Sequence, residues 1–562
     1  MKKLIALVLL LAAATCLFAA KVNKIMPFTK GLNLSIWLED LGGGNSRSLL
    51  FNRQDFEDIK SLGVEIVRIP IWFEEFSSGE PDYIVEDWLW EKIDNAVEWC
   101  TELEMYVIID FHNNTAGDTK TRPDIEKVLL KIWPQIAERY KDSGEYILYE
   151  IMNEPHMKSG NMAADVAKWG KLQGNVLKEI RKIDKTHTVI VCAEDFCSVS
   201  YLLKLPDYKD DNLIYNFHDY SPFLFTQQGG FWVGLENVRH IPFPYSKEKM
   251  PPIPKNATDS EKWLMENYKQ QSSEATLAKP LDEAVKFANK RGVALMCNEY
   301  GVDMTYADSE ERINWYRLKA KWMDERNIIR LSWDYRDHYG IFKNTSYTAR
   351  FPEDLNIEII EAMGYEVPKM ENHKHYSWFE NAKRTGDYTI YRNGFIKGIV
   401  TSGEGITKLR INKKDSPDGE MYIHIPKAPE WGLFNCLFGE NCDLSELVNS
   451  GKVLEFEART AQRSINMQVY FEDTEIPDNG REGFAWRCQK DIRSTQLPAD
   501  GNWHKISIPL KEFADIGAWN DYEKKWIDSE GLFSWSKVNS LTFAFYEKNL
   551  QNDVSIRNIA IR

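Results

Sequence analysis

Short apolar runs alternate with stretches of helical spacing from residue 31 to residue 333, and this alternation constrains the fold more than any other feature. About eight runs have the length and apolar content of buried strands, at residues 31–36, 64–71, 105–111, 147–154, 188–193, 213–218, 293–299 and 328–333. Helices are expected between them, among them 51–62, 89–103, 125–140 and 165–183, with Asn52 placed to cap the first. Such alternation predicts an α/β fold with a parallel sheet, closed into a (β/α)8 barrel.

Two of these runs lead into a glutamate. Residues 147–155 open onto Asn153 and Glu154, and residues 292–301 contain Glu299 at the end of a second apolar run. Because the carboxyl ends of barrel strands meet at one mouth, both carboxyl groups are expected there. Glycosidic bond cleavage typically uses two carboxyl groups, one protonated to assist the leaving oxygen and one ionised to meet the charge that develops on the sugar. Taken alone, Asn-Glu-Pro also fits an ordinary helix start, with Pro155 in the first turn.

Six further polar or aromatic residues lie at the ends of the expected strands or next to them: Arg68, His112, Asn153, His218, Tyr220 and Trp333. With Glu154 and Glu299, and in this order, the set resembles glycoside hydrolase family 5, the retaining β-glycanases of the cellulase type. The resemblance covers roughly residues 28–366. It implies a TIM barrel that hydrolyses β-glycosidic bonds by double displacement.

The resemblance implies that Glu154 is the acid/base and Glu299 the nucleophile. Arg68 and Tyr220 would keep Glu299 ionised, since a cation and a hydroxyl donor favour the charged form. Arg68 could instead be a structural ion pair at the barrel mouth. Retention is expected if the two carboxyl groups lie about 5 to 5.5 Å apart.

Four residues are implied to hold the sugar. Asn153 would donate to the 2-hydroxyl, His112 and His218 would hold other hydroxyls or orient Glu154, and Trp333 would offer an apolar face to the ring. An isolated His or Trp in a barrel more often serves packing, so these roles depend on the complete set. No metal or other cofactor is expected, because no His/Cys cluster has ligand spacing.

A long segment without clear periodicity, residues 221–258, follows the sixth expected strand. It contains the aromatic pair Phe231 and Trp232 and the proline-rich stretch 250–254. Loops of this length in a compact barrel are usually functional or mobile, so we expect it to form one wall of a substrate cleft. The alternative is a hydrophobic cover on the barrel rim.

The composition changes after about residue 366. A polar connector at 367–374 leads into β-like runs at 386–395, 421–425, 452–457, 465–471, 503–509, 541–546 and 554–561, and turns at 478–480 and 500–501 suit hairpins. These predict a smaller all-β jelly-roll sandwich that resembles the galactose-binding-like carbohydrate-binding modules. A sugar platform there could include Trp431, Trp486, Trp519, Trp526 or Trp535. The expected organisation is a signal peptide at 1–20, a catalytic barrel at 21–368 and a binding module at 369–562.

The N-terminus has Lys2 and Lys3, an apolar core and an alanine-rich end, which together are typical of a secretory signal peptide. An extracellular or periplasmic location permits disulfides, and Cys436 and Cys442 are the pair expected to be bridged. The remaining cysteines of the barrel are expected to be small buried hydrophobic residues: Cys100, Cys192, Cys197 and Cys297.

A net charge of −15 and a pI near 5.4 argue against a nucleic acid or an anionic membrane as partner, and a neutral polysaccharide is compatible with them. The protein is expected to act as a monomer. Among the polymers cut by the family, β-1,4-glucan is favoured because it is the most frequent substrate, with mannan, xyloglucan and xylan as alternatives. A secreted binding protein that has lost activity is an alternative of another class, and the presence of both glutamates argues against it.

Overall fold

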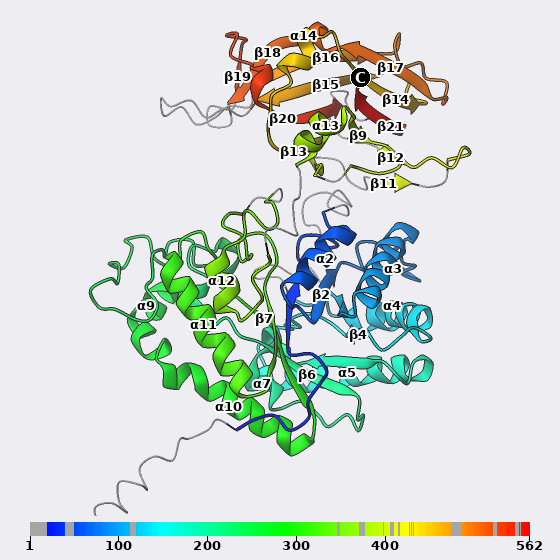
Figure 1. Cartoon of the computed structure of the whole chain (residues 1–562). Helices are drawn as coiled ribbons and strands as arrows, with labels where there is room; N and C mark the ends of the chain where they lie inside the picture. Colours follow the sequence, from blue (N-terminus) through cyan, green and yellow to red (C-terminus); the bar gives the residue numbers. More distant parts are fainter. Residues whose placement is uncertain are drawn as a thin grey trace, which may run out of the picture.

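The computed structural model describes residues 20–39, 50–112, 120–345, 349–369, 377–396, 398–404, 410–413, 416–425, 428, 430, 432–473, 486–520, 525–545, 550 and 552–562. Figure 1 shows a barrel surrounded by helices, coloured blue to green, and an all-β part, coloured yellow-green to red. The expected signal peptide, apart from Ala20, lies outside the described residues. Among the described residues, none of the helices combines the length and the apolar character needed to cross a bilayer.

Eight parallel strands follow one another around the barrel, and β1 pairs with β8 to close it. Their bounds are β1 (Lys30–Asn33), β2 (Ile66–Ile71), β3 (Tyr106–Phe111), β4 (Ile147–Glu150), β5 (Thr188–Cys192), β6 (Leu213–His218), β7 (Ala294–Tyr300) and β8 (Ile329–Ser332). The predicted (β/α)8 barrel is confirmed. The predicted ends of two strands were wrong: β1 stops at Asn33 rather than at residue 36, and β4 stops at Glu150. Glu154 lies in the loop that follows β4, with a φ of 41° that no strand accommodates.

Helices cover the outside of the barrel (Figure 1). They are α2 (Arg53–Ser61), α3 (Asp87–Glu102), α4 (Ile125–Tyr140), α5 (Met162–Ile183), α6 (Glu194–Cys197), α7 (Val199–Leu202), α8 (Phe223–Thr226), η2 (Phe231–Val233), α9 (Asp259–Gln271), α10 (Glu274–Arg291), α11 (Ser309–Glu325) and α12 (Ile357–Ala362). Asn52 caps α2 as predicted, since its side chain accepts the Gln54 N–H at 2.9 Å while Asp55 accepts the Asn52 N–H at 2.9 Å.

The barrel interior is built in two layers. The lower layer is an apolar cluster that takes residues from the strands: Ile66, Ile108, Leu148, Ile190, Ile214, Ala294, Met296, Ile329 and Leu331. Two positions further along their strands come buried polar residues, which therefore point to the same side: Arg68, Asp110, Glu150, Asn216 and Asn298. The polar layer thus stands on a packed apolar floor.

Residues 221–258 pack mainly as a cover. Leu224, Phe225, Leu235 and Val238 are buried in the large apolar cluster between the barrel and its helices. This burial supports the alternative of a hydrophobic cover for most of the segment. The exceptions among the large apolar residues are Phe231, Ile253 and Phe223, which are 78%, 42% and 40% exposed.

The C-terminal part is a sandwich of two antiparallel sheets, ordered β10-β13-β20-β15-β16-β18-β19 and β11-β12-β21-β14-β17, with β9 paired to β21. The strands are β9 (Tyr388–Tyr391), β10 (Val400–Glu404), β11 (Arg410–Lys413), β12 (Tyr422–Ile425), β13 (Gly432–Cys442), β14 (Val453–Thr460), β15 (Asn466–Asp473), β16 (Trp486–Arg493), β17 (His504–Pro509), β18 (Ala514–Asn520), β19 (Lys525–Ile527), β20 (Val538–Phe545) and β21 (Val554–Ile561). Short helices are α13 (Trp378–Thr385), α14 (Ser445–Asn449), η4 (Leu510–Glu512) and η5 (Trp535–Lys537). The predicted sandwich is confirmed, and its seven predicted runs correspond to β9, β12, β14, β15, β17, β20 and β21.

The sandwich has an apolar core of its own, and in the described part of the chain this core shares no residue with the barrel clusters. Residues of β14 alternate between buried and half-buried along their whole length, as expected when one face of a sheet covers a core. Among the tryptophans considered as a sugar platform, Trp486 is buried, Trp535 packs against the core and Trp519 is 40% exposed. Trp431 and the predicted turn at 478–480 lie outside the described residues.

The predicted disulfide between Cys436 and Cys442 was wrong, because both are free, buried cysteines of the same strand, β13. Six positions along a strand correspond to about 20 Å, whereas bridged cysteines have Cα atoms less than about 7 Å apart. The four cysteines of the barrel are buried, as predicted.

Candidate active site

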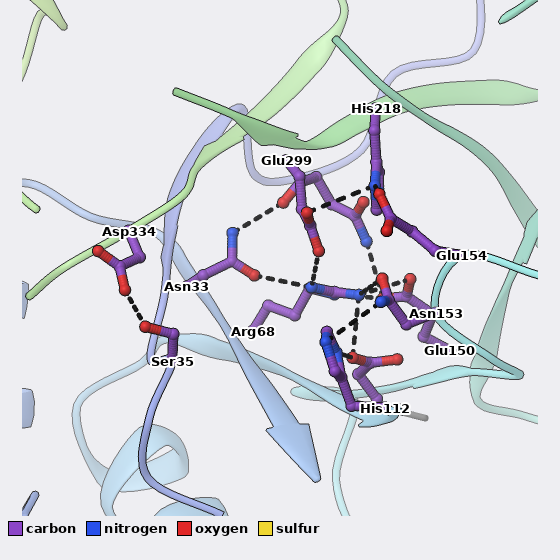
Figure 2. Close-up of polar contacts among 12 residues, drawn as sticks. Asn33, Ser35, Arg68, His112, Glu150, Asn153, Glu154, His218, Glu299 and Asp334 are labelled. Atoms are coloured by element: carbon purple, nitrogen blue, oxygen red, sulfur yellow. Dashed lines mark hydrogen bonds and ion pairs between the residues drawn. The ribbon is translucent and has the colours of Figure 1, made fainter. Parts of the chain in front are cut away.

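The site is organised around Arg68, a fully buried residue of β2. Its guanidinium contacts three carboxylates: Glu150 at 2.7 and 3.1 Å, Asp110 at 2.9 Å and Glu299 at 2.8 Å. It also donates to the side-chain oxygens of Asn33 at 3.0 Å and Asn153 at 2.9 Å. Figure 2 shows the contacts with Asn33, Glu150, Asn153 and Glu299 converging on the one guanidinium group. Arg68 thereby links β2 to residues of β1, β3, β4 and β7 and to Asn153, which follows the carboxyl end of β4.

This arrangement keeps the arginine charged. Burial would lower the pKa of Arg68, but Asp110, Glu150 and Glu299 outweigh it and raise that pKa well above its usual value. Burial raises the pKa of Glu150, against the attraction of Arg68. Glu150 also accepts from the Asn298 side chain at 2.7 Å, so its second neighbour is a neutral donor.

Glu299 lies on β7 with only 6% of its side chain exposed. Arg68 donates to one carboxylate oxygen, and the Tyr220 hydroxyl donates to the other at 2.9 Å. His218 Nδ1 lies 3.4 Å from that second oxygen. Burial would raise the pKa of Glu299, but His218, Arg68 and His112 outweigh it and lower that pKa, so the carboxylate is held in its ionised form.

Glu154 differs from Glu299 in its backbone and its exposure. It lies after the end of β4 in the left-handed region, and 27% of its side chain is exposed. The turn is held from several sides, because the Asn153 N–H donates to the Phe111 carbonyl at 3.0 Å and His156 Nδ1 contacts the Glu154 carbonyl at 2.5 Å. The carboxyl group therefore faces the opening of the site, whereas Glu299 is enclosed.

His218 connects the two glutamates. Its Nδ1 lies 2.7 Å from Glu154 Oε1, and the nearest ligand atoms of Glu154, His218 and Glu299 all lie within 4.8 Å of one another. Burial would lower the pKa of His218, but Cys197, Glu299 and Glu154 raise it well above its usual value. Because the pKa of the Cys197 thiol is itself raised well above its usual value, this thiol is neutral and the carboxylates sustain the shift.

These three side chains are also the one group of described residues whose ligand atoms are close enough to hold a metal ion. A metal would have to displace the proton that His218 shares with the glutamates, and the raised pKa of His218 opposes that loss. The arrangement suits proton transfer better than metal ligation.

Asn153, His112 and Trp333 form the opposite side of the site. The Asn153 side-chain oxygen accepts from Arg68, which directs its amide nitrogen to His112 Nε2 at 3.2 Å. His112 Nδ1 lies 2.7 Å from Asp110, and its ring stacks on Trp333 with centroids 5.9 Å apart. Burial would lower the pKa of His112, but Glu39 and Asp110 raise it to about 9.

The structure brings together all eight residues selected from the sequence: Arg68, His112, Asn153, Glu154, His218, Tyr220, Glu299 and Trp333. Sequence reasoning missed the partners beneath and beside them: Asn33, Glu39, Asp110, Glu150 and Asn298. Asn33, Asp110, Glu150 and Asn298 could have been found from the sequence, because each is a carboxylate or amide inside an otherwise apolar strand, on the side of the strand that faces the barrel interior. Glu39 carried no such signal, because it follows β1 in a loop.

A (β/α)8 barrel with paired carboxyl groups at its mouth is the arrangement of a glycoside hydrolase. Residues 29–339, more than half of the 562-residue chain, match the family model described as cellulase (glycosyl hydrolase family 5), and the chain belongs to this family. Residues 376–562 match the model described as carbohydrate binding domain 30. Both matches confirm the resemblance inferred from the sequence.

Several endoglucanases are similar to this chain. Endoglucanase 3 of Fibrobacter succinogenes is 27% identical over 342 residues, which cover 57% of this chain and 52% of that protein. Endoglucanase C of Acetivibrio thermocellus is 29% identical over 326 residues, which cover 56% of this chain and 92% of that protein. Endoglucanase H of the same organism is 23% identical over 530 residues, which cover 90% of this chain and 51% of that protein. The matched part is thus about half the length of the first and third relatives.

Replacement of Arg68 by methionine is expected to destabilise the barrel by about 3–5 kcal/mol near pH 7, because three buried carboxylates lose their shared cation. Without the cation, burial raises the folded-state pKa values of Glu150 and Glu299 above the unfolded ones, so stability is retained at low pH and lost as pH rises through the folded values. The deficit relative to the native protein, measured by urea unfolding, should therefore be smaller at pH 4.5 than at pH 7.5.

Arg330→Met is the matched control. Arg330 is also buried, but its carboxylate partner Asp324 is 51% exposed and can be solvated when the cation is lost. Its deficit should depend little on pH over the same range. Equal deficits for Arg68→Met at both pH values would contradict the proposed electrostatic origin.

Proposed function

We propose that this chain is a secreted, retaining endo-β-1,4-glucanase. Residues 21–368 would be the catalytic unit, and residues 369–562 would be the unit that binds polysaccharide. Family membership, the carbohydrate-binding-domain match and the names of the similar endoglucanases support this proposal. The signal peptide expected at the N-terminus supports secretion.

The carboxyl pair carries the proposal. A carboxylate oxygen of Glu154 lies within 4.8 Å of a carboxylate oxygen of Glu299. Retaining enzymes place their two carboxyl groups about 5–5.5 Å apart, whereas inverting enzymes need about 6.5–9.5 Å to admit a water molecule between carboxylate and sugar. The short separation supports double displacement.

The different surroundings of the two glutamates support their roles. Glu299 has Arg68, Tyr220 and His218 around its carboxylate, so it would be the ionised nucleophile that attacks the anomeric carbon. Glu154 contacts His218 and faces the opening, so it would donate a proton to the departing glycosidic oxygen. The bond from C1 to that oxygen breaks as the bond from C1 to Glu299 forms.

In the second step Glu154 would accept a proton from water, and the resulting oxygen nucleophile would release the sugar from Glu299 with overall retention. Asn153 would donate to the 2-hydroxyl of the sugar being cleaved, and Trp333 would lie against the apolar face of its ring. His112 and His218 would orient these groups. A hydrogen bond to the 2-hydroxyl that strengthens in the transition state lowers the barrier of both steps.

The choice of polymer rests on relatives named as endoglucanases. β-Mannanase, xyloglucanase and xylanase are the alternatives within the family. The direct test is product analysis on purified cellulose derivatives, mixed-linkage glucan, mannan, xylan and xyloglucan. We expect the release of oligosaccharides from the β-1,4-glucans. Faster cleavage of mannan would make mannan, rather than glucan, the assigned substrate. Binding without release from any polymer between pH 4 and 8 would contradict an enzymatic role.

Glu299→Ala is expected to abolish turnover and to be partly rescued by azide, which enters the space left by the nucleophile. Attack on the vacated face of a β-glycoside gives the α-glycosyl azide, detectable by NMR. Glu154→Ala should lose most activity on polysaccharide and much less on activated aryl glycosides, because only a poor leaving group needs a proton in the first step. A β-glycosyl azide from the Glu299 variant would contradict the assignment, and exchanged behaviour of the two variants would reverse the roles.

A fragment ending near Pro368 is expected to retain activity on soluble glucan, because all eight candidate residues lie in the barrel, while the full chain should be more active on insoluble glucan. A binding module mainly raises the local concentration of enzyme on a surface, a gain that a dissolved polymer hardly provides. The fragment beginning near Lys369 should fold alone, since the sandwich has its own apolar core, and should bind insoluble glucan.

Activity on both forms of substrate and thermal melting of each fragment measure these outcomes. Equal activity of full and truncated chains on insoluble glucan, with no retention of the isolated sandwich on cellulose, mixed-linkage glucan or mannan, would remove the binding role. A large loss of barrel stability on truncation would indicate a structural support instead.

A further inference from the structure

We infer that Glu39 is a positioning residue that acts through His112 to leave the Asn153 amide free for the sugar 2-hydroxyl. This inference rests on the proposed function and assigns a role to a carboxylate outside the eight residues discussed above. Glu39 follows β1 in a loop, and only 13% of its side chain is exposed.

The position of Glu39 is fixed by two contacts. Its Oε1 accepts the Ile36 N–H at 2.9 Å, across a turn in which Ile36 has a φ of 55°. Its Oε2 lies 3.2 Å from His112 Nε2. The carboxylate is therefore held against the imidazole edge that faces the site.

Two groups compete for His112 Nε2. Glu39 Oε2 can only accept a hydrogen bond there, whereas the Asn153 amide nitrogen, also at 3.2 Å, can only donate one. The orientation of the Asn153 amide is set by Arg68, which donates to its oxygen at 2.9 Å. The protonation state of Nε2 thus decides which partner is satisfied.

Protonation of His112 resolves the competition. With Nδ1 directed at Asp110, a protonated ring donates Nε2–H to Glu39. The Asn153 amide then loses the acceptor that it has among the described residues and is available to the sugar. A neutral ring with its proton on Nδ1 instead accepts from Asn153 at Nε2 and holds the amide away from the sugar.

The charges around His112 favour the protonated ring. Glu39 faces it from the loop after β1, Asp110 from β3 and Arg68 from β2, with Glu299 on β7 beyond Arg68. Burial would lower the pKa of His112, but the two carboxylates raise it to about 9. Burial raises the pKa of Glu39 against the attraction of His112, so the ion pair exists in the interval between the two pKa values. His112 in turn helps to lower the pKa of Glu299.

The test compares native protein and Glu39→Gln on 2,4-dinitrophenyl β-cellobioside and on the analogue that lacks the 2-hydroxyl next to the leaving group. This leaving group needs no proton from Glu154, so the alkaline limb of kcat/KM reports on other groups of the site, and a shift of that limb in Glu39→Gln reports on His112, which Glu39 contacts. At pH 6 the substitution should lower kcat/KM roughly 10- to 100-fold on the parent substrate, because it removes a hydrogen bond to the 2-hydroxyl that strengthens in the transition state, and less than about 3-fold on the analogue. The alkaline limb should move to lower pH, because the neutral amide of this variant does not raise the pKa of His112 as the carboxylate does.

Glu311→Gln is the matched control, because Glu311 is also 13% exposed, accepts a backbone N–H from Phe243 at 3.0 Å and pairs with Lys249, away from the site. It should change neither the substrate ratio nor the pH limb. Glu39→Asp keeps the charge and should preserve the position of the limb, which also covers the case in which Glu39→Gln fails to fold in a thermal melt.

Equal losses on both substrates with an unchanged alkaline limb would overturn the inference and reduce Glu39 to a structural role. A limb that moves in Glu39→Asp as far as in Glu39→Gln would also overturn it, because charge would then not be the cause. Native protein inactive on both substrates would instead overturn the proposed function, and the inference with it.

Discussion

One buried guanidinium group determines how the mouth of this barrel is arranged. Arg68 has no exposed surface and contacts Asp110, Glu150 and Glu299. Without this cation, the burial of each of the three carboxylates would be costly. The three carboxylates come from β3, β4 and β7, so the ion cluster also fixes the relative positions of these strand ends. Arg68 therefore has two roles: it neutralises the buried carboxylates, and it fixes the relative positions of the residues of the candidate site.

The apolar floor beneath the cluster explains why this geometry can be kept. Ile66, Ile108 and Leu148 fill the lumen directly under Arg68, Asp110 and Glu150, so the polar residues cannot sink into the barrel. Their side chains are fully buried and held by one another's hydrogen bonds and ion pairs, so their dipoles and charges are already oriented. Preorganised groups of this kind are the largest single source of transition-state stabilisation in many enzymes.

Much of this could be predicted from the sequence, because the strands carry strong apolar signals and each ends near a polar residue. The set of eight candidate residues followed from that periodicity and from a family pattern. What failed depended on three-dimensional detail. The left-handed turn at Glu154 is set by contacts with Phe111 and His156 rather than by local propensity, the two cysteines of β13 looked close only along the chain, and Glu39 reaches His112 through a turn after β1. The sandwich strands that were not predicted are β10, β11, β13, β16, β18 and β19. β11 and β19 are short, whereas β13 alternates between buried and half-buried residues along most of its length and offered a signal that was not used.

The two glutamates are held differently, and this difference bears on how far each carboxyl group can move during the proposed reaction. Glu299 lies on a strand with donors on both oxygens, which suits an atom that must occupy one place while a covalent bond forms and breaks. Glu154 lies on a turn beyond its strand, partly open to solvent and with a contact from His218 to one oxygen. Its carboxyl group can therefore shift slightly, first following a departing oxygen and then receiving an incoming water. The barrel thus pairs a fixed carboxylate with an adjustable one, and the difference originates in the backbone that carries each of them.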